Sequence, residues 1–402
     1  MRILYILPFV PWPVRVRSYN LIPRLAREHS IDLVCLATSA QDMGRLDEVR
    51  KYCASVRVCG HNKFGALART AISLPTRRPL REAFFQSSAM RREVGDAIAQ
   101  NQPDVIYVER WRALQYVPQE CRVPIVCDPT DSMTLYNRRL MSAGCWWERI
   151  IGTEEYLKFR SFEPKLARRV ASAVFCSNVD KESVQALAPD ASCVQVANGV
   201  DCDRFYRKSE GEEDPETIFF SGAFGYRPNR HAVRYFIQHV YPLIRQERSN
   251  VRLVLVGNQA SRFLLKEHRG TPGLQITDFV PELRPALASA TVSIAPIVVG
   301  AGVSNKILEA FAVGTPMVAT QMACGDLPVR HGEHLLLAST PREFADNTLA
   351  LLSNRELRES LANAGRKLVE EQYDWEIVAR HMESVLMQCA GVDTSIAAVA
   401  SR

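Results

Sequence analysis

The segment GVSNKILEAFAVGTPMVAT, residues 302–320, joins a glycine-containing loop to a short apolar helix and then to a strand-like run. Lys306 and Glu309 are three residues apart, so a helix places both side chains on one face. The run from Pro316 to Thr320 follows at once, as it does in repeating helix–strand units. A helix start behind a glycine loop offers unpaired backbone N–H groups to an anion. The segment therefore predicts an α/β fold with an anion site, and a solvated Lys–Glu pair is the alternative.

Short apolar runs bounded by turn residues recur along the whole chain, and amphipathic stretches separate them. Such runs are typical of strands that are buried on both faces of a parallel sheet. The predicted strands lie in 2–9, 32–37, 56–60, 104–109, 124–128, 172–177, 193–199, 218–223, 251–257, 274–280, 292–297, 316–320 and 334–338. Two strand–helix series in tandem predict an α/β protein with two doubly wound, Rossmann-like domains facing across a cleft.

The length of 402 residues exceeds what one hydrophobic core usually holds. We expect a first domain over 1–200 and a second over 201–374. The acidic, turn-rich stretch 207–217 is predicted to be the linker between them. A helix over 375–390 is expected to pack back on the first domain, and 391–402 to form a flexible tail.

Composition and charge narrow the class of protein. Hydrophobic residues make up 47% and charged residues 23% of the chain, as in ordinary soluble proteins. The net charge of +6 suits anionic ligands or acidic membranes but is too small for a nucleic-acid footprint. The 11 cysteines show no paired or metal-type spacing, which favours reduced thiols. The uncharged run 285–305 contains proline and glycines and would make a poor membrane span. We expect a cytoplasmic protein, and peripheral contact with the inner face of a membrane stays open.

The segment 302–320 resembles the donor site of family-four glycosyltransferases, which are retaining enzymes with the GT-B fold. In that family a Gly–x–x–x–Lys–[Ile/Val]–Leu–Glu–Ala stretch leads into a Gly–x–Pro–Val–Val–Ala–Thr strand. The motifs NGVDCDRF (198–205) and FFSGAFGYRPNRHAV (219–233) are similar to the end of the first domain and the start of the second. VLVGNQ, ITDFVPEL, DLPVRHGEHLLLA and YDWEIVARHMESVL follow in the order of the family. The resemblance covers 170–390 and is looser in 1–150, and it is nearest to the branch associated with exopolysaccharide biosynthesis.

The resemblance implies roles for particular residues. Glu309 would hold the ribose and Lys306 a phosphate. Apart from the resemblance, the position of Ser304 at the start of the helix predicts that it caps the helix. Arg227 would supply a second cation to the diphosphate, with Arg230 as the alternative. The implied donor-binding set is Gly222, Asn229, Phe279, Val280, Gly302, Val303, Ser304, Asn305 and Glu309.

Two positions depart from the pattern of the family. Ala301 stands where many members carry a glutamate that contacts the donor sugar, and Thr130 stands where many carry a histidine. Asp128 and Asp131 are the candidate replacements in the first domain, although an aspartate at a strand end can also simply cap a turn.

The first domain also offers basic residues. Arg15 and Arg17 could approach a phosphate or an acidic acceptor. The basic and aromatic stretch 75–85 is either an edge that faces an acceptor or membrane, or a solvated loop.

The predicted function is retaining, metal-independent hexosyl transfer from a nucleoside-diphosphate sugar to a hydroxyl acceptor, which is a glycan, a lipid-linked molecule or a natural product. Asp131, Asp128, Lys306 and Arg227 form the predicted catalytic group, and the two domains would close over the donor. No metal, no cofactor beyond the co-substrate and no nucleic-acid partner are expected. A catalytically silent nucleotide-sugar-binding or scaffold protein is the main alternative. A sugar-nucleotide epimerase would need several acid–base groups, which the absence of histidine between His61 and His231 disfavours.

Overall fold

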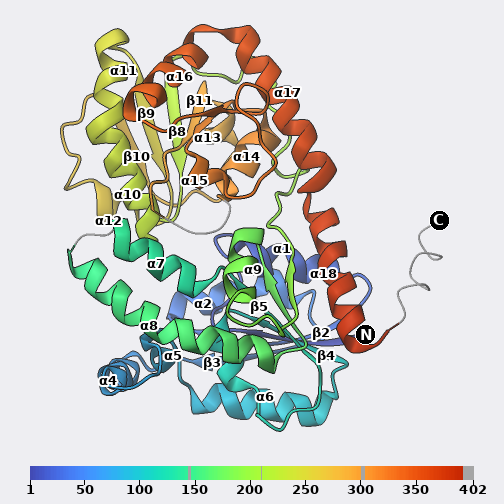
Figure 1. Ribbon diagram of the computed structural model, residues 1–402. Coiled ribbons are helices and arrows are strands. Elements are labelled where there is room, and N and C mark those ends of the chain that lie inside the picture. Colours follow the sequence, from blue (N-terminus) through green and yellow to red (C-terminus); the bar gives the residue numbers. More distant parts are fainter. Residues whose placement is uncertain (144–145, 210, 300–303, 393–402) are drawn as a thin grey trace. The chain divides into compact units, whose positions relative to one another are not determined.

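The computed structural model describes residues 1–143, 146–209, 211–299 and 304–392 (Figure 1). The chain forms two compact units. The first comprises residues 1–197 together with the C-terminal segment from Glu376, and the second comprises Asn198–Trp375. The chain therefore passes from one unit to the other after residue 197 and again after residue 375. The sequence predicted domain changes after residues 200 and 374.

The first unit contains a seven-stranded parallel sheet in the order β3-β2-β1-β4-β5-β6-β7. Its strands are β1 (Arg2–Leu7), β2 (Ser30–Ala37), β3 (Ser55–Gly60), β4 (Val105–Glu109), β5 (Ile125–Thr130), β6 (Ser172–Phe175) and β7 (Cys193–Gln195). The chain builds outward to one side from β1 through β2 to β3, and to the other side from β4 onward. The order therefore reverses between β1 and β4, which are neighbours in the sheet.

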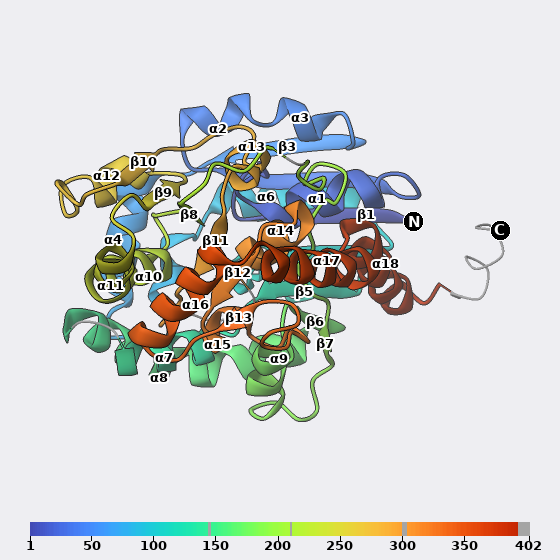
Figure 2. The same ribbon diagram turned by 90° about the horizontal axis from the view of Figure 1, so that it is seen from above.

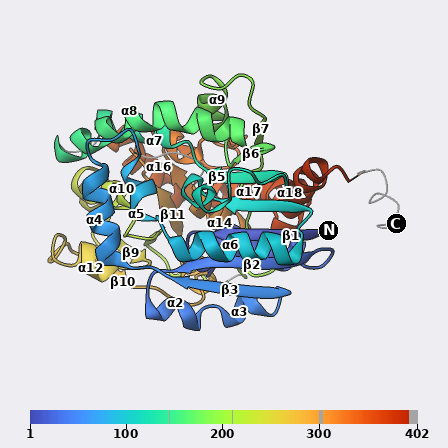
Figure 3. The same ribbon diagram turned by 90° about the horizontal axis from the view of Figure 1, so that it is seen from below.

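Helices pack against the sheet of the first unit because their apolar residues share one face. In α6 (Ser88–Asn101), Met90, Val94 and Ala97 are fully buried in the core that also contains Leu4 and Ile6 of β1, and Figure 3 shows α6 lying over β1 and β2. The other helices are α1 (Val16–Leu25), α2 (Ala40–Gly44), α3 (Asp47–Arg50), α4 (Lys63–Ser73), α5 (Leu80–Phe84), the 3-10 helix η1 (Trp111–Tyr116), α7 (Met133–Ala143), α8 (Trp146–Arg169) and α9 (Asn178–Gln185).

The last helix, α18 (Trp375–Ala390), is held to the first unit by ion pairs. Glu376 accepts hydrogen bonds from Arg24 at 2.9 Å and from Arg27 at 2.7 Å. About two turns further along the helix, Glu383 Oε1 lies 2.8 Å from Nε2 of His29. Residues 393–402 of the predicted tail lie outside the described residues. No helix in the described ranges is long and apolar enough to cross a membrane.

The second unit contains a six-stranded parallel sheet in the order β10-β9-β8-β11-β12-β13. Its strands are β8 (Thr217–Ser221), β9 (Arg252–Val256), β10 (Leu274–Thr277), β11 (Val292–Ala295), β12 (Met317–Ala319) and β13 (Leu336–Leu337). Its helices are α10 (Arg227–Tyr235), the π-helix η2 (Phe236–Val240), α11 (Tyr241–Glu247), α12 (Ala260–Leu264), α13 (Arg284–Ala288), α14 (Asn305–Val313), α15 (Gln321–Cys324), α16 (Pro341–Ser353) and α17 (Arg355–Gln372). The predicted fold class, two parallel-sheet α/β domains, is confirmed.

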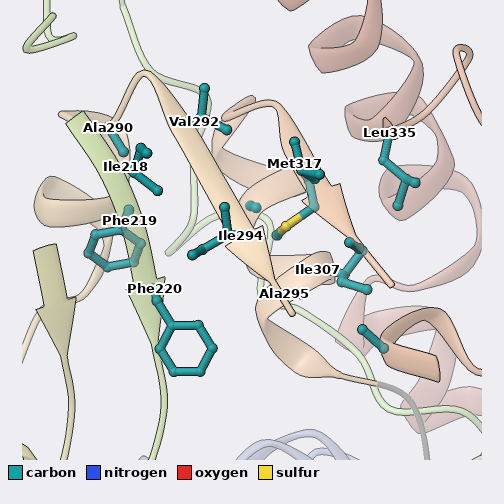
Figure 4. Close-up of a cluster of buried hydrophobic side chains, with 14 of the residues drawn as sticks. Ile218, Phe219, Phe220, Ala290, Val292, Ile294, Ala295, Ile307, Met317 and Leu335 are labelled. Atoms are coloured by element: carbon teal, nitrogen blue, oxygen red, sulfur yellow. The ribbon is translucent and has the colours of Figure 1, made fainter. Parts of the chain in front are cut away.

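The core of the second unit explains why α14 is placed so firmly. Ile307 of α14 is fully buried beside Ile294 of β11 and Met317 of β12 (Figure 4). α14 also lies next to α17, as Figure 2 shows. A side chain at Gly365 of α17 would come within 2.8 Å of the Phe311 ring, so glycine lets the two helices approach. The helix that carries the predicted phosphate and ribose ligands is therefore packed on two sides.

The predicted linker at 207–217 is wrong, because this segment belongs to the second unit. Lys208 donates its backbone N–H to the Val313 carbonyl at 2.8 Å, and Asp214 donates to the Ser289 carbonyl at 2.7 Å. Its acidic side chains pair with basic residues of the same unit, as Glu212 does with Arg284. The charges that resembled a solvated linker are thus neutralised on the surface of the domain.

Candidate functional site

The order of strands in the second unit reverses between β8 and β11, which are neighbours. Ligands of doubly wound sheets bind outside the carboxyl ends of the strands at this point. The loop from Gly222 to Asn229 follows β8, and α14 begins after β11. The two segments that the resemblance singled out are therefore brought together by the topology of the sheet.

Lys306 is the cation of this site, and its described partners are neutral. Its Nζ donates to Ser304 Oγ at 2.9 Å and to Asn229 Oδ1 at 3.3 Å, and it lies 5.0 Å from the centre of the Phe220 ring. Within the described ranges no carboxylate oxygen lies within 4.0 Å of this ammonium. Burial lowers the pKa of Lys306 to about 8, and Glu309 counteracts this only in part. A half-buried ammonium without an ion-pair partner is suited to receive an anion.

Glu309 follows one turn later on α14, where burial raises the pKa of its carboxyl group and Lys306 and Arg204 oppose the rise. In the described part of the chain its carboxylate accepts no hydrogen bond. Carboxylate oxygens that are half-buried and unoccupied can accept from two adjacent hydroxyl groups. Lys306 and Glu309 thus present a phosphate ligand and a hydroxyl ligand on the same helix face.

Glycines let the loop after β8 close tightly. A side chain at Gly222 would lie 2.6 Å from Asn229 Nδ2, and Gly222 donates its N–H to the Val256 carbonyl at 3.0 Å. Gly257 has φ +154, and a Cβ there would come within 1.9 Å of the Gly222 carbonyl oxygen. Asn229 donates from Nδ2 to the Ala223 carbonyl at 3.0 Å, which turns its Oδ1 toward Lys306. The loop thus fixes Asn229, in the first turn of α10, which in turn orients the ammonium.

The start of α14 differs in detail from the expectation. Ser304 occupies the N-cap position, but its side chain caps no backbone N–H and accepts from Lys306 instead. The predicted cap is therefore wrong, because the ammonium competes for the hydroxyl oxygen. Asn305 Oδ1 is buried without a hydrogen-bond partner in the described chain. Gly302 and Val303, together with Ala301, lie outside the described residues.

The remaining predicted residues of the second unit lie on neighbouring loops. Phe279 follows β10 with 42% of its surface exposed, and Val280 packs on the core. Arg227 is half-buried at the first position of α10. Arg230 is engaged otherwise, because it donates to the Phe224 carbonyl at 2.6 Å and stacks on Phe263.

Arg204 was missed by sequence reasoning, although it lies in the quoted motif NGVDCDRF. Its Nη2 donates to the Pro281 carbonyl at 2.9 Å, and it pairs with Glu282 at 3.2 Å. The charge of Arg204 also opposes the rise in the pKa of Glu309 on α14 that burial causes. The motif shows a basic residue after a turn, but nothing local indicates which element its side chain reaches.

In the first unit, Asp128 and Arg17 form a buried ion pair inside the domain, with side-chain exposures of 0% and 3%. Tyr107 donates its hydroxyl to Asp128 at 2.7 Å, and Arg17 donates to the carbonyls of Ala197 at 2.9 Å and Val196 at 3.0 Å. Each of these groups is fully occupied by protein partners. The pair ties β5 and α1 to the segment after β7.

Asp131 reaches the surface, with 28% of its side chain exposed, and its Oδ2 lies 3.5 Å from Arg110 Nη1. Burial raises the pKa of Asp131 to about 6, while Arg110 counteracts the rise. Arg15 is exposed and stacks its guanidinium on Phe9 at 4.6 Å. Arg110 was not predicted, because a single arginine after a strand carries no motif. Across the described ranges, no group of histidine, cysteine, aspartate or glutamate side chains is arranged to hold a metal ion.

Residues 215–354 match the family described as Glycosyl transferases group 1. The matched segment lies within the second unit and contains Lys306 and Glu309. The resemblance to glycosyltransferases is therefore confirmed for this domain.

Curated relatives match part of the chain. A phosphatidyl-myo-inositol mannosyltransferase of Mycobacterium tuberculosis is 30% identical over 220 residues, which are 52% of this chain and 57% of that protein. The mannosyltransferase of the same description from Mycobacterium leprae is 29% identical over 248 residues, 60% of each chain. The chain thus matches less than two thirds of the length of these relatives.

Solved structures resemble the whole described chain. A sucrose-phosphate synthase from Thermosynechococcus elongatus matches with a TM-score of 0.73 and 15% identity, covering 96% of this chain and 99% of that one. Alr3699/HepE of Anabaena, solved in complex with UDP and glucose, matches with a TM-score of 0.69 and 16% identity over 96% and 100%. At such identities the likeness concerns the fold, and the predicted GT-B fold is confirmed.

Proposed function

We propose that this chain is a glycosyltransferase that moves a sugar from a nucleoside-diphosphate sugar to a hydroxyl acceptor. The observation that carries the proposal is the pairing on α14 of an ammonium with neutral partners and an unoccupied carboxylate one turn away. An anion and a pair of hydroxyl groups are what such a face can bind, and a nucleoside diphosphate carries both. The family match of residues 215–354 and the relatives named above support the same reading.

In this proposal α14 binds the donor. The Lys306 ammonium and the amides at the start of the helix hold the diphosphate, and Arg227 adds a second positive charge. Glu309 accepts hydrogen bonds from the ribose hydroxyls, and the free Oδ1 of Asn305 offers one more acceptor. Phe279 and Val280 border the base. Gly222, Asn229 and Ser304 of the donor set border the diphosphate, and Gly302 and Val303, which complete that set, lie outside the described residues.

The reaction breaks the bond between the anomeric carbon and the diphosphate oxygen and forms a bond from that carbon to the acceptor oxygen. The electron pair stays on the diphosphate, and the proton of the acceptor hydroxyl leaves with it, so that no strong protein base is needed. Negative charge grows on the leaving group as the bond breaks, and Lys306 stabilises it there. We propose retention of the anomeric configuration, with no metal ion and no cofactor beyond the nucleotide sugar.

The first unit then supplies the acceptor side. Asp131 is the carboxylate of the predicted pair that reaches the surface, while Asp128 holds Arg17 in the interior. The acceptor is a hydroxyl of a glycan, a lipid-linked molecule or a natural product, and peripheral contact with the inner face of a membrane would fit a lipid-linked one.

Two measurements on the same samples test the proposal. Thermal unfolding with UDP, GDP, dTDP and ADP identifies the nucleotide, because a ligand at about a hundredfold its Kd stabilises by about 2.7 kcal/mol. Release of that nucleoside diphosphate from the matching nucleotide sugars then measures turnover with candidate acceptors. We expect stabilisation by one nucleotide, and we expect Glu309→Ala to abolish it. Stabilisation without turnover would favour a silent nucleotide-sugar-binding protein, and the absence of any stabilisation would contradict the donor site.

A further inference from the structure

The first unit has its own topological switch point, between β1 and β4. The two strands run parallel, with Ile6 paired to Val108, so the segments that follow them leave the same edge of the sheet side by side. Arg15 lies in the segment after β1, and Arg110 and Arg112 follow β4 directly. Three guanidinium groups are thus delivered to the place where doubly wound sheets bind ligands.

The charge of a fourth guanidinium group, that of Arg81 on α5, also acts on Arg112. We call Arg15, Arg81, Arg110 and Arg112 the arginine cluster. Burial and then the charges of Arg110, Arg15 and Arg81 lower the pKa of Arg112 to about 9. Partial loss of water around its exposed side chain, and then the charge of Arg110, likewise lower the pKa of Arg15. Neighbouring guanidinium groups thus disfavour the charges of Arg112 and Arg15. Asp131 and Glu109, by contrast, raise the pKa of Arg110 against the effect of burial.

Aromatic rings contact three members of the cluster, Arg15, Arg81 and Arg112, whereas Arg110 lies beside carboxylates. Arg15 stacks on Phe9 at 4.6 Å, and Arg112 stacks on Phe85 at 4.4 Å. Neither of these arginines, nor Arg81, forms an ion pair within 4.0 Å with a carboxylate of the described chain. Arg112 Nε is also buried without a hydrogen-bond partner there.

Acidic groups near the cluster are mostly occupied or neutralised. Asp131 and Glu109 face Arg110, at 3.5 Å and 3.9 Å. The charge of Glu82 acts on Arg112, and burial raises the pKa of the Glu82 carboxyl group to about 7. In the described ranges Arg110 therefore has ion-pair partners within 4.0 Å, whereas Arg15, Arg81 and Arg112 have none.

Arg110 adds a backbone feature that fits a binding role. Its φ is +71, in the left-handed region, and it donates its N–H to the Asp128 carbonyl at 2.7 Å and its Nη1 to the Pro129 carbonyl at 3.0 Å. Residues other than glycine hold this conformation at a free-energy cost and gather at functional sites. The strand end thus presents Arg110 in one fixed orientation.

We propose that the arginine cluster binds an anionic group, a phosphate or a carboxylate, on the acceptor molecule. The assignment of this ligand as the acceptor rests on the function proposed above, whereas the anion site itself does not. Arg110 and Arg112 would contact the anion from the sheet, and the exposed Arg15 and Arg81 would close around it. The acceptor is thereby an acidic molecule whose hydroxyl is positioned by its charge.

The test separates this site from the donor site. Calorimetric titration uses the full chain with Lys306→Met, which removes the donor-side ammonium, and three probes: glucose 6-phosphate, glucuronate and glucose. We expect at least one charged sugar to bind and glucose to bind no better than buffer. Adding Arg15→Gln and Arg112→Gln should weaken that binding by about tenfold or more, because charge-assisted hydrogen bonds are lost. Arg168→Gln, an exposed arginine paired with Asp190 outside the cluster, is the matched control.

The outcomes are distinct. A preference for the phosphate or for the carboxylate identifies the anion and supports the site, and Arg112→Lys should retain part of the affinity because it keeps the charge. Equal binding of charged and neutral sugars, or equal effects of the cluster and control substitutions, overturns the proposal. If the double variant does not fold by thermal unfolding, Arg15→Gln alone decides, since Arg15 is exposed. Failure of nucleotide binding by the wild-type chain would refute the donor site without touching this result.

Discussion

The site on α14 and the arginine cluster occupy the same place in their sheets, the carboxyl edge at a switch point, but they are assembled differently. Ser304, Lys306 and Glu309 lie within one turn and a half of a single helix. The cluster draws its charges from the loop after β1, from α5 and from the residues after β4. The second unit encodes its site in one short segment, whereas the first builds its site through tertiary structure.

The two regions differ also in how their charges are satisfied. In the second unit Lys306 has neutral oxygens around it and one carboxylate a turn away. In the first unit the interior pair Arg17–Asp128 has its hydrogen-bonding groups occupied by protein partners. Arg15 and Arg112 of the arginine cluster, by contrast, contact aromatic rings and form no ion pair in the described ranges. The comparison teaches that buried charge marks a ligand site only where protein partners are missing.

The largest effect should come from breaking the satisfied pair. Asp128→Ala leaves the Arg17 guanidinium buried and uncompensated, so we expect a loss of about 3–5 kcal/mol in the free energy of unfolding. Denaturant unfolding measures it. A loss below about 1 kcal/mol would contradict a structural role for the pair and would return Asp128 to the list of catalytic candidates.

Removing the Lys306 ammonium, which has no ion-pair partner in the described ranges, should lower activity and leave the free energy of unfolding nearly unchanged. Lys306→Met is expected to lower kcat by about 10²–10³-fold, because it removes stabilisation of the charge that develops on the diphosphate. The free energy of unfolding should change little, since a half-buried ammonium that has only neutral partners is replaced by an apolar chain of similar shape. Lys367→Met on exposed α17 is the matched control. Equal kcat values in the two variants would remove Lys306 from the site.

A smaller change tests the carboxylate. Glu309→Gln keeps the shape of the side chain but loses the charge, so the ribose hydroxyls donate to a weaker acceptor. We expect the Kd for the nucleotide to rise by about tenfold. Calorimetry of wild type and variant gives the comparison, and an unchanged Kd would place the ribose elsewhere.

The smallest effect is a pH dependence of nucleotide binding. The pKa of Lys306 in the free protein is lowered to about 8, and a bound diphosphate favours the protonated ammonium and raises that pKa. Affinity should therefore be full below pH 8 and fall as the pH rises above it, by up to about tenfold per pH unit. Lys306→Met should flatten the profile over that range. A wild-type profile that stays level between pH 7 and 9 would contradict the lowered pKa.

Much of the fold could be predicted from the sequence because parallel strands are buried on both faces. Each strand of the described chain coincides with an apolar run, from β1 to β13. The long helix α8 lacks such a signal, since Phe159 is buried while Ile150 and Leu157 are exposed on the same helix. The acidic composition of 207–217 predicted a linker wrongly, because a segment that forms ion pairs within a domain and a solvated linker can have the same composition.

The candidate site divides in the same way. Lys306, Ser304 and Glu309 could be predicted together because their spacing on one helix is visible in the sequence. The turn of the Ser304 hydroxyl toward Lys306, and the approach of Arg204 to Glu309, depend on where other segments lie in space. Arg110 and Arg112 had no motif at all, and only the neighbouring positions of β1 and β4 join them to Arg15.

The double passage of the chain between the units bears on the order in which the protein is made. Ribosomes deliver the N-terminal segments first, and domains generally fold as they emerge. The second unit, Asn198–Trp375, is continuous and can complete its core as soon as α17 has been synthesised. The first unit begins earlier but receives α18 last, when Glu376 reaches Arg24 and Arg27. The first unit therefore begins to be synthesised before the second but is completed after it. A chain that ends before residue 376 lacks the ion pairs of Glu376 with Arg24 and Arg27 that hold α18 to the first unit.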